Sequence, residues 1–197
     1  MLYIVGGAPR AGKSMLAQWM LDEQKMAYFP ADILMMGLAL AMPELGLNPS
    51  DPARTRAPIM WPILRGMAVT ILQNGEDYLL EGDVLMPAHV VELRERFGSA
   101  VMSCFIGYES VDSLAKVRDI RRHASGKKDW TNECDDSHLL RIVGEFKSLS
   151  EHLRIECAKY ELAYFDGSAD LFAAIDQASA YLRDRQTRSR RLTSGRG

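Results

Sequence analysis

Near its start the chain reads Gly7-Ala8-Pro9-Arg10-Ala11-Gly12-Lys13-Ser14, which matches the pattern G-x-x-x-x-G-K-S. This stretch follows an apolar run at residues 2–5 and leads into an apolar-rich segment that begins at Met15. A strand, a glycine-rich loop and a helix start form the context in which this pattern binds phosphate, because backbone N–H groups at a helix N-terminus surround an anion. We therefore expect residues 7–15 to bind the phosphates of a nucleoside triphosphate.

Two side chains of this loop carry specific chemistry. Lys13 can reach the β- and γ-phosphates, and the hydroxyl of Ser14 can ligate Mg²⁺. The motif thus predicts ATP and Mg²⁺ as cofactors, although it does not by itself distinguish ATP from GTP.

The composition is that of one folded domain, with 197 residues of which 47% are apolar and 25% charged. A net charge of −2 provides no general attraction to nucleic acid or to a membrane. Residues 183–197 contain six arginines and one acid, which leaves a net charge of about −7 on residues 1–182. We expect a single domain over residues 1–182 and a disordered basic tail, with a phosphate-contacting tail as the alternative.

The cysteines and histidines do not suggest a metal or disulfide framework. The three cysteines and four histidines lack the spacing of a zinc site, and no C-x-x-C pair is present. We expect no signal peptide, and the sequence contains no apolar run of 18 residues. These features favour a reducing cytoplasm and no membrane partner, and they leave the oligomeric state open.

Apolar runs of strand length alternate with segments of helical period. The expected strands are residues 2–6, 26–30, 77–81, 99–106 and 162–166. The expected helices are residues 14–25, 33–42, 58–74, 87–97, 137–160 and 169–184. This alternation predicts an α/β fold with a parallel sheet, in which ligands bind beyond the carboxyl ends of the strands. The Pro-rich residues 48–58 and the polar residues 125–133 are expected to be loops.

Carboxylates follow two of the expected strands. Asp32 follows the second strand, where a carboxylate can orient an acceptor hydroxyl and take its proton. The structural alternative for Asp32 is an N-cap of a helix that begins at Ile33. Glu81 and Asp83 follow the third strand, where one of them can hold Mg²⁺ directly or through its waters.

Arginines are concentrated before the polar segment. Arg118, Arg121 and Arg122 share one helical face, since they are three and four residues apart. Arginine stabilises the charge on a moving phosphoryl group, so we expect a lid at about residues 111–135 with Arg118 and Arg122 as catalytic groups. A solvated helix face is the alternative. Further candidates, for binding an anionic part of the substrate, are Arg54, Arg56 and Arg65.

Together these marks resemble the small P-loop kinases of the nucleoside-monophosphate-kinase-like group, which includes shikimate kinase, gluconate kinase, chloramphenicol phosphotransferase and the zeta toxins. The shared features are the loop at residues 7–14, Asp32, the pair Glu81-Gly82 and the arginine-bearing lid. Residues 80–83, 129–131 and 164–167 further resemble bacterial proteins described as adenylate-kinase-like or 2-phosphoglycerate-kinase-like. The resemblance implies a P-loop NTPase three-layer sandwich with a five-stranded parallel sheet in the order 2-3-1-4-5. It also implies a closing helical lid, and adenine held near Asp166 to Ser168.

The chain departs from individual members of that group on the acceptor side. Met35 stands where adenylate kinases carry an arginine, and the segment after the third strand contains neither D-G-F/Y-P-R nor the glycine triplet of shikimate kinase. The implied function is ATP- and Mg²⁺-dependent transfer of the γ-phosphoryl group to a hydroxyl or phosphate of a small molecule, whose identity stays open.

Two other functions are compatible with a phosphate-binding loop. One is a nucleotide-binding regulator or weak NTPase that controls a partner, which a D-x-x-G after the third strand or an N-K-x-D would favour; neither occurs. The other is a nucleic-acid-directed kinase that uses the Arg-rich tail, and the acidic character of residues 1–182 argues against it.

Overall fold

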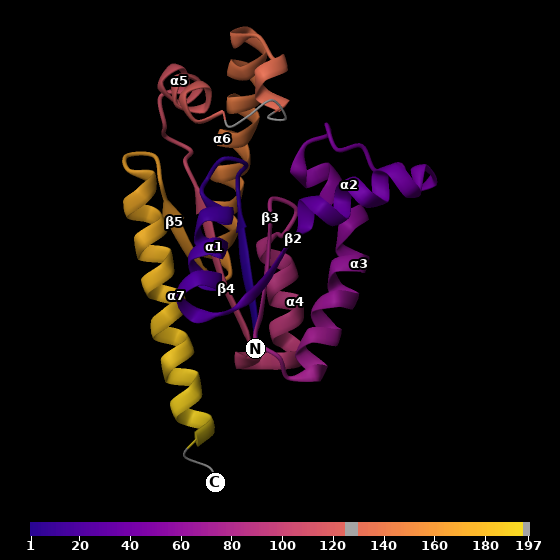
Figure 1. Cartoon of the computed structure of the whole chain (residues 1–197), viewed down its shortest axis with the longest axis vertical. Helices are drawn as coiled ribbons and strands as arrows, with labels where there is room; N and C mark the ends of the chain where they lie inside the picture. Colours follow the sequence, from indigo (N-terminus) through magenta and orange to yellow (C-terminus); the bar gives the residue numbers. More distant parts are fainter. Residues whose placement is uncertain (125–129, 195–197) are drawn as a thin grey trace.

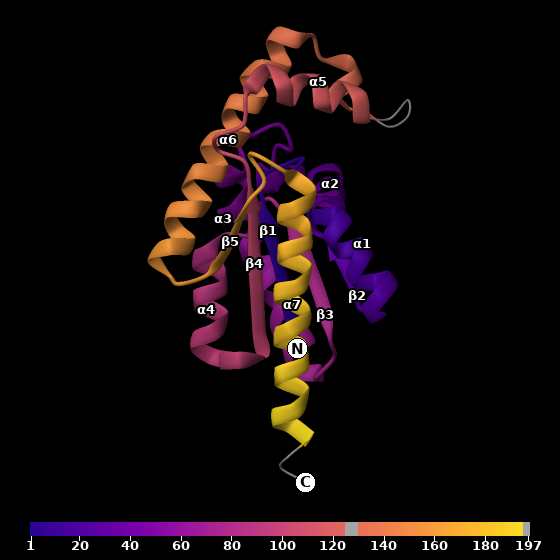
Figure 2. The same ribbon diagram turned by 90° about the vertical axis from the view of Figure 1, so that its left-hand side faces the viewer.

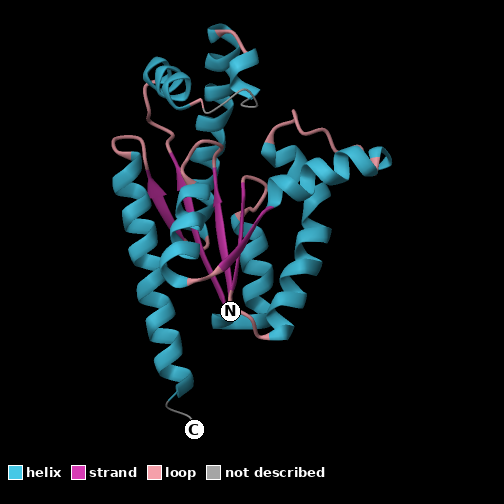
Figure 3. Cartoon of the chain, viewed as in Figure 1, coloured by secondary structure: helices cyan, strands magenta, loops and turns pink. Residues whose placement is uncertain are grey.

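Five parallel strands form one sheet in the order β2-β3-β1-β4-β5 (Figures 1 and 3). The computed structural model describes residues 1–124 and 130–194, without the side chains of Trp130 and residues 185–194. The strands are β1 (Leu2–Gly7), β2 (Ala27–Pro30), β3 (Tyr78–Gly82), β4 (Val101–Gly107) and β5 (Ala163–Asp166). The fold class and the strand order are therefore as expected from the sequence.

Helices cover both faces of the sheet and make three layers (Figures 1 and 2). The helices are α1 (Lys13–Gln24), α2 (Ala31–Ala41), α3 (Ala53–Asn74), α4 (Pro87–Phe97), α5 (Ser113–His123), α6 (Asp136–Lys159) and α7 (Leu171–Ser194), with short 3₁₀ turns η1 (Pro43–Leu45), η2 (Gly98–Ala100) and η3 (Trp130–Glu133). Helices α1 and α7 cover one face, and α3, α4 and α6 cover the other. Across the described residues, no helix combines the length and apolar character needed to cross a membrane.

The central strands are buried on both sides. Every residue of β1 and β4 is buried, as the continuous apolar character of these segments requires in a parallel sheet covered by helices. The flanking strands β2 and β5 are partly exposed. All five strands end at the upper edge in Figure 3, so the loops that follow them meet there.

Two helix starts differ from expectation. Helix α2 begins at Ala31, so Asp32 lies in its first turn and does not cap it. Helix α3 begins at Ala53 and contains Pro58, because its buried residues Ala53, Ala57, Met60 and Leu64 recur with helical period from Ala53 onward. Residues 48–58 are therefore only partly loop.

The C-terminal segment also differs from expectation. Helix α7 continues through Ser194, so residues 183–194 extend the helix where a disordered tail was expected. Arg and Gln have high helix propensity, and this composition allows the helix to continue.

A close approach between two elements determines the geometry at the end of β3. A Cβ atom added to Gly82 would lie 2.8 Å from the Cβ of Ala31, which is buried at the start of α2. Only glycine allows this contact without a shift of the backbone. The ends of β2 and β3, and the carboxylates that follow them, are thereby held together.

The substitution Gly82→Ala is expected to lower the free energy of unfolding by about 1–3 kcal/mol, the usual cost of overpacking. Gly66→Ala is the matched control, since Gly66 lies within α3 and no atom comes within 4 Å of an added Cβ there. This control should gain about 0.5–1 kcal/mol from helix propensity. Urea unfolding measures both, and a Gly82→Ala protein as stable as Gly66→Ala would contradict the close approach.

Candidate functional site

The loop at residues 7–14, here called the P-loop, leaves β1 at the upper edge of the sheet and ends in α1. Gly12 precedes α1 with φ of 83°, a left-handed conformation that favours glycine. A side chain at this position would also overlap Ile175 of α7. The packing of α7 against the loop therefore requires glycine at position 12.

Donors of the P-loop converge on one carbonyl oxygen. Lys13 Nζ and the backbone N–H of Ala11 both donate to the oxygen of Ala8, at 2.9 and 3.2 Å. The Lys13 side chain is buried within the loop. An anionic phosphate oxygen is a stronger acceptor than a carbonyl, so the loop holds an ammonium and backbone donors ready for an anion.

Ser14 and Glu81 form a pair at the end of the loop. Ser14 Oγ donates to Glu81 Oε1 at 2.9 Å, and Glu81 is buried at the end of β3. Burial raises the pKa of Glu81, while the Lys13 ammonium and the Ser14 hydrogen bond oppose that increase. A hydroxyl beside one carboxylate fits Mg²⁺, which binds few protein ligands together with substrate phosphates and water.

The carboxylates do not form a cation site of their own. Within residues 1–124 and 130–194, no three His, Cys, Asp or Glu side chains converge in a way that could hold a metal ion. Two protein ligands at the Ser14–Glu81 pair would leave the other positions of an octahedral Mg²⁺ to water and to the phosphates of a bound nucleotide.

Asp83 is held in a buried ion pair. Arg56 Nη2 donates to Asp83 Oδ2 at 2.7 Å, and both side chains are 7% exposed. The remaining donors of Arg56 contact Met35 Sδ and the carbonyl oxygen of Asp51, each at 2.7 Å. The other oxygen of Asp83, Oδ1, is buried without a partner among the described residues. Of the two metal candidates, the structure thus places Asp83 with Arg56 and Glu81 with Ser14.

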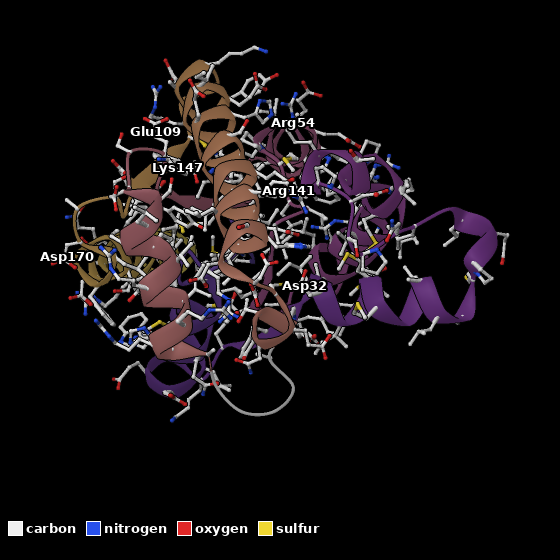
Figure 4. The ribbon with its side chains drawn as sticks, turned by 90° about the horizontal axis from the view of Figure 1, so that it is seen from above. Asp32, Arg54, Glu109, Arg141, Lys147 and Asp170 are labelled. Atoms are coloured by element: carbon white, nitrogen blue, oxygen red, sulfur yellow. The ribbon has the colours of Figure 1, made fainter. Side chains whose placement is uncertain are left out.

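Asp32 lies at the same edge, in the first turn of α2 (Figure 4). Its side chain has access to solvent. Partial burial raises the pKa of Asp32, and the nearby Asp83 carboxylate adds to the increase, whereas Lys13 and Arg56 oppose it. The structure therefore brings Asp32, Lys13 and the Arg56–Asp83 pair within electrostatic reach of one another.

The three arginines of α3 have different surroundings. Arg56 is part of the site, as described above. Arg54 is exposed at the start of α3 and lies close enough to α6 to lower the pKa of His152, although burial contributes more. Arg65 pairs with Glu92 of α4 on the outer surface, three turns of α3 below Arg54, and the structure does not bring it to the P-loop.

The predicted lid contains α5 and η3, which stand above the sheet (Figure 2). Arg118 and Arg122 are exposed and form no hydrogen bond or ion pair with the described residues. Arg121 differs, because it donates to the carbonyl oxygen of Thr131 at 2.7 Å and pairs with Asp136 at 2.9 Å. It joins α5 to the start of α6. Residues 125–129 of the expected polar loop lie outside the described residues.

The loop after β5 is tied to the loop after β4. Ser168 Oγ donates to Asp166 Oδ1 at 2.6 Å and accepts from the N–H of Ser110 at 3.0 Å. The N–H of Gly167 donates to the oxygen of Gly107 at 2.8 Å. These bonds hold the segment expected to receive adenine at the same edge as the P-loop.

Two residues that sequence reasoning missed also contact the P-loop. Tyr108 Oη donates to the oxygen of Pro9 at 2.6 Å, and Lys116 Nζ donates to the oxygen of Arg10 at 3.0 Å. Burial lowers the pKa of Lys116, and the Asp119 carboxylate opposes that decrease. Tyr108 directly follows β4, so its place after a strand was an available signal, whereas nothing in the sequence distinguishes Lys116.

Comparison of whole structures shows which fold the chain has. It resembles shikimate kinase from Bacteroides thetaiotaomicron, with 12% identity, a TM-score of 0.56, and coverage of 93% of this chain and 98% of that one. It also resembles a gluconokinase from Sinorhizobium meliloti 1021, with 17% identity, a TM-score of 0.52, and coverage of 93% and 95%. The chain therefore shares its fold with these two kinases. No family model and no curated protein sequence matches it.

The substitution Arg56→Met is expected to reduce the free energy of unfolding by about 3–5 kcal/mol, because it leaves the Asp83 carboxylate buried and unpaired. Arg65→Met is the matched control on the same helix. Its pair with Glu92 is 52% and 44% exposed, so the loss should be about 0–1 kcal/mol. The double variant Arg56→Met/Asp83→Asn should regain part of the loss. Equal, small losses for Arg56→Met and Arg65→Met would show that the Arg56–Asp83 pair is not buried.

Proposed function

We propose that the protein is an ATP- and Mg²⁺-dependent kinase that transfers the γ-phosphoryl group to a hydroxyl of a small molecule. The observation that carries this proposal is the meeting of Lys13 and Ser14 with Glu81 and Asp32 at one edge of the sheet. The shared fold with small-molecule kinases supports it. A regulator that only binds nucleotide would not need a solvent-accessible carboxylate such as Asp32 beside the P-loop.

On the nucleotide side, Lys13 leaves the Ala8 carbonyl and pairs with the β- and γ-phosphates. We assign the metal to Ser14 and Glu81, and not to Asp83, because the Arg56 guanidinium already neutralises Asp83. Mg²⁺ bound there would neutralise part of the negative charge on the phosphates. The exposed guanidinium groups of Arg118 and Arg122 are the lid charges available to the transferred group.

On the acceptor side, Asp32 orients the acceptor hydroxyl. The hydroxyl oxygen forms a bond to the γ-phosphorus and releases its proton to Asp32, while the bond from that phosphorus to the bridging oxygen breaks and ADP leaves. Arg56 and Asp83 lie within electrostatic reach of Asp32, and Asp83 Oδ1 is buried without a hydrogen-bond partner among the described residues. These groups suit a hydroxyl-bearing acceptor, and Arg54 is the exposed cation that an anionic substituent would meet.

The first test is nucleotide binding. Saturating Mg-ATP should stabilise the wild-type protein by about 3 kcal/mol at a hundredfold excess over Kd, and Lys13→Ala should abolish the increase in melting temperature. Lys159→Ala, which removes an exposed lysine at the far end of α6, should leave the increase unchanged. The absence of any increase in the wild-type protein at millimolar Mg-ATP would contradict the proposal.

The second test concerns Asp32. Asp32→Asn should lower kcat by about 100-fold or more, the usual scale for loss of a general base, with ATP affinity nearly kept. Only ionised Asp32 accepts a proton, so kcat should fall as the pH decreases through the pKa of Asp32. Because this pKa is raised, the midpoint of the fall should lie at a higher pH than for an ordinary aspartate.

The acceptor for this assay is first identified by ADP release with a panel of small hydroxylated compounds. Asp22→Asn, an exposed change on α1, is the control. Unchanged turnover in Asp32→Asn would assign Asp32 a structural role.

A further inference from the structure

Two buried side chains, Tyr108 and Lys116, support the P-loop from the side away from its expected phosphate site. Tyr108 Oη donates to the oxygen of Pro9 at 2.6 Å, and Lys116 Nζ donates to the oxygen of Arg10 at 3.0 Å. The Lys116 ammonium also lies 4.3 Å from the centre of the Tyr108 ring, so the two side chains hold each other in place. Consecutive carbonyl groups of the loop are thus anchored from one side.

Anchoring these carbonyl groups orients the N–H groups of the loop. In a planar trans peptide the C=O and the following N–H point in opposite directions. Holding the oxygens of Pro9 and Arg10 outward therefore directs the N–H groups of Arg10 and Ala11 inward. The N–H of Ala11 indeed donates to the Ala8 oxygen, the acceptor that Lys13 also uses.

Lys116 brings a charge to this position as well as a hydrogen bond. Its side chain is 6% exposed, and the carboxylate of Asp119, with which it pairs, is 3.9 Å away. A poorly solvated ammonium behind the loop raises the electrostatic potential inside it, which favours a polyanion. A neutral donor at this position would support the loop geometry without this contribution.

The position of Lys116 on α5 connects the loop to the expected lid. The start of α5 is held on its other side by Lys147 of α6, whose Nζ donates to the oxygen of Val111 at 2.7 Å (Figure 4). Asp112 caps the helix through the N–H of Ala115 at 2.7 Å. The first turn of α5 is therefore fixed to the body of the protein, and the arginines lie beyond the fixed part.

From this geometry we propose that Lys116 is a positioning residue for polyphosphate binding, which holds the P-loop in its anion-binding conformation through Arg10 and ties the first turn of α5 to the loop. The proposal rests on the nucleotide binding proposed above and adds a residue that touches the loop but not the nucleotide. It assigns Tyr108 the supporting role of orienting the peptide that follows Pro9.

The test compares Mg-ATP and adenosine binding by calorimetry in Lys116→Met, Lys116→Arg and Tyr108→Phe. Lys159→Met is the control, since Lys159 is 58% exposed at the end of α6. Lys116→Met should weaken Mg-ATP binding by about tenfold or more, the scale of one charge-assisted hydrogen bond, and leave adenosine binding unchanged. Lys116→Arg should retain affinity within about threefold, and Tyr108→Phe should lose about fivefold, as for a neutral bond.

Three results would overturn the proposal: Lys116→Met binds Mg-ATP as tightly as Lys159→Met, it loses ATP and adenosine affinity equally, or Lys116→Arg is as impaired as Lys116→Met. If Lys116→Met does not fold, Lys116→Gln replaces it. This variant removes the charge but keeps a donor, so Mg-ATP binding should weaken by a smaller factor, about fivefold, while adenosine binding again stays unchanged. If the wild-type protein does not bind Mg-ATP, the proposed function itself is contradicted. If the wild-type protein binds Mg-ATP and Lys116→Met binds it equally well, only the role of Lys116 is contradicted.

Discussion

The parallel pairing of β1 between β3 and β4 determines where the groups of the candidate site lie. The register aligns Val5 with Glu81 on one side and with Cys104 on the other, so the three strands end at nearly the same level. The P-loop, Glu81 and Tyr108 therefore leave the sheet side by side, although the sequence separates them widely. Every contact that we attribute to the site depends on this alignment, and the close approach of Gly82 to Ala31 adds the end of β2.

Differences between their partners give the three carboxylates different properties. A buried charge is tolerated only with a partner, and Asp83 has the Arg56 guanidinium while Glu81 has the Ser14 hydroxyl near Lys13. Asp32 has no such partner among the described residues, keeps access to solvent, and has a raised pKa. A carboxylate of this kind is open to an acceptor hydroxyl, whereas the side chains of the other two are held by their partners. The guanidinium of Arg56 also contacts Met35, so this one side chain joins α3 both to α2 and to Asp83.

The sequence predicts the fold well, because the P-loop and the alternation of strands and helices are local patterns. It does not show which of Glu81 and Asp83 is free to hold a metal. The partner of Asp83 is Arg56, which lies 27 residues away on α3, and prolines within that helix make its start hard to predict. It also does not reveal that Lys116 supports the P-loop. Lys116 contacts a backbone carbonyl, and such a contact does not depend on the type of the partner residue, so no sequence motif marks it. The three arginines of α5 look equivalent in the sequence, and only the structure shows that Arg121 joins α5 to α6.

The most direct test of the central claim is a crystal structure of the protein with Mg²⁺ and a non-hydrolysable ATP analogue. The account predicts the β-phosphate within the P-loop, Lys13 moved from Ala8 to the phosphates, and the metal beside Ser14 and Glu81, with the Arg56–Asp83 pair unchanged. A nucleotide bound away from the P-loop, or a metal held by Asp83 after the pair with Arg56 has broken, would contradict it.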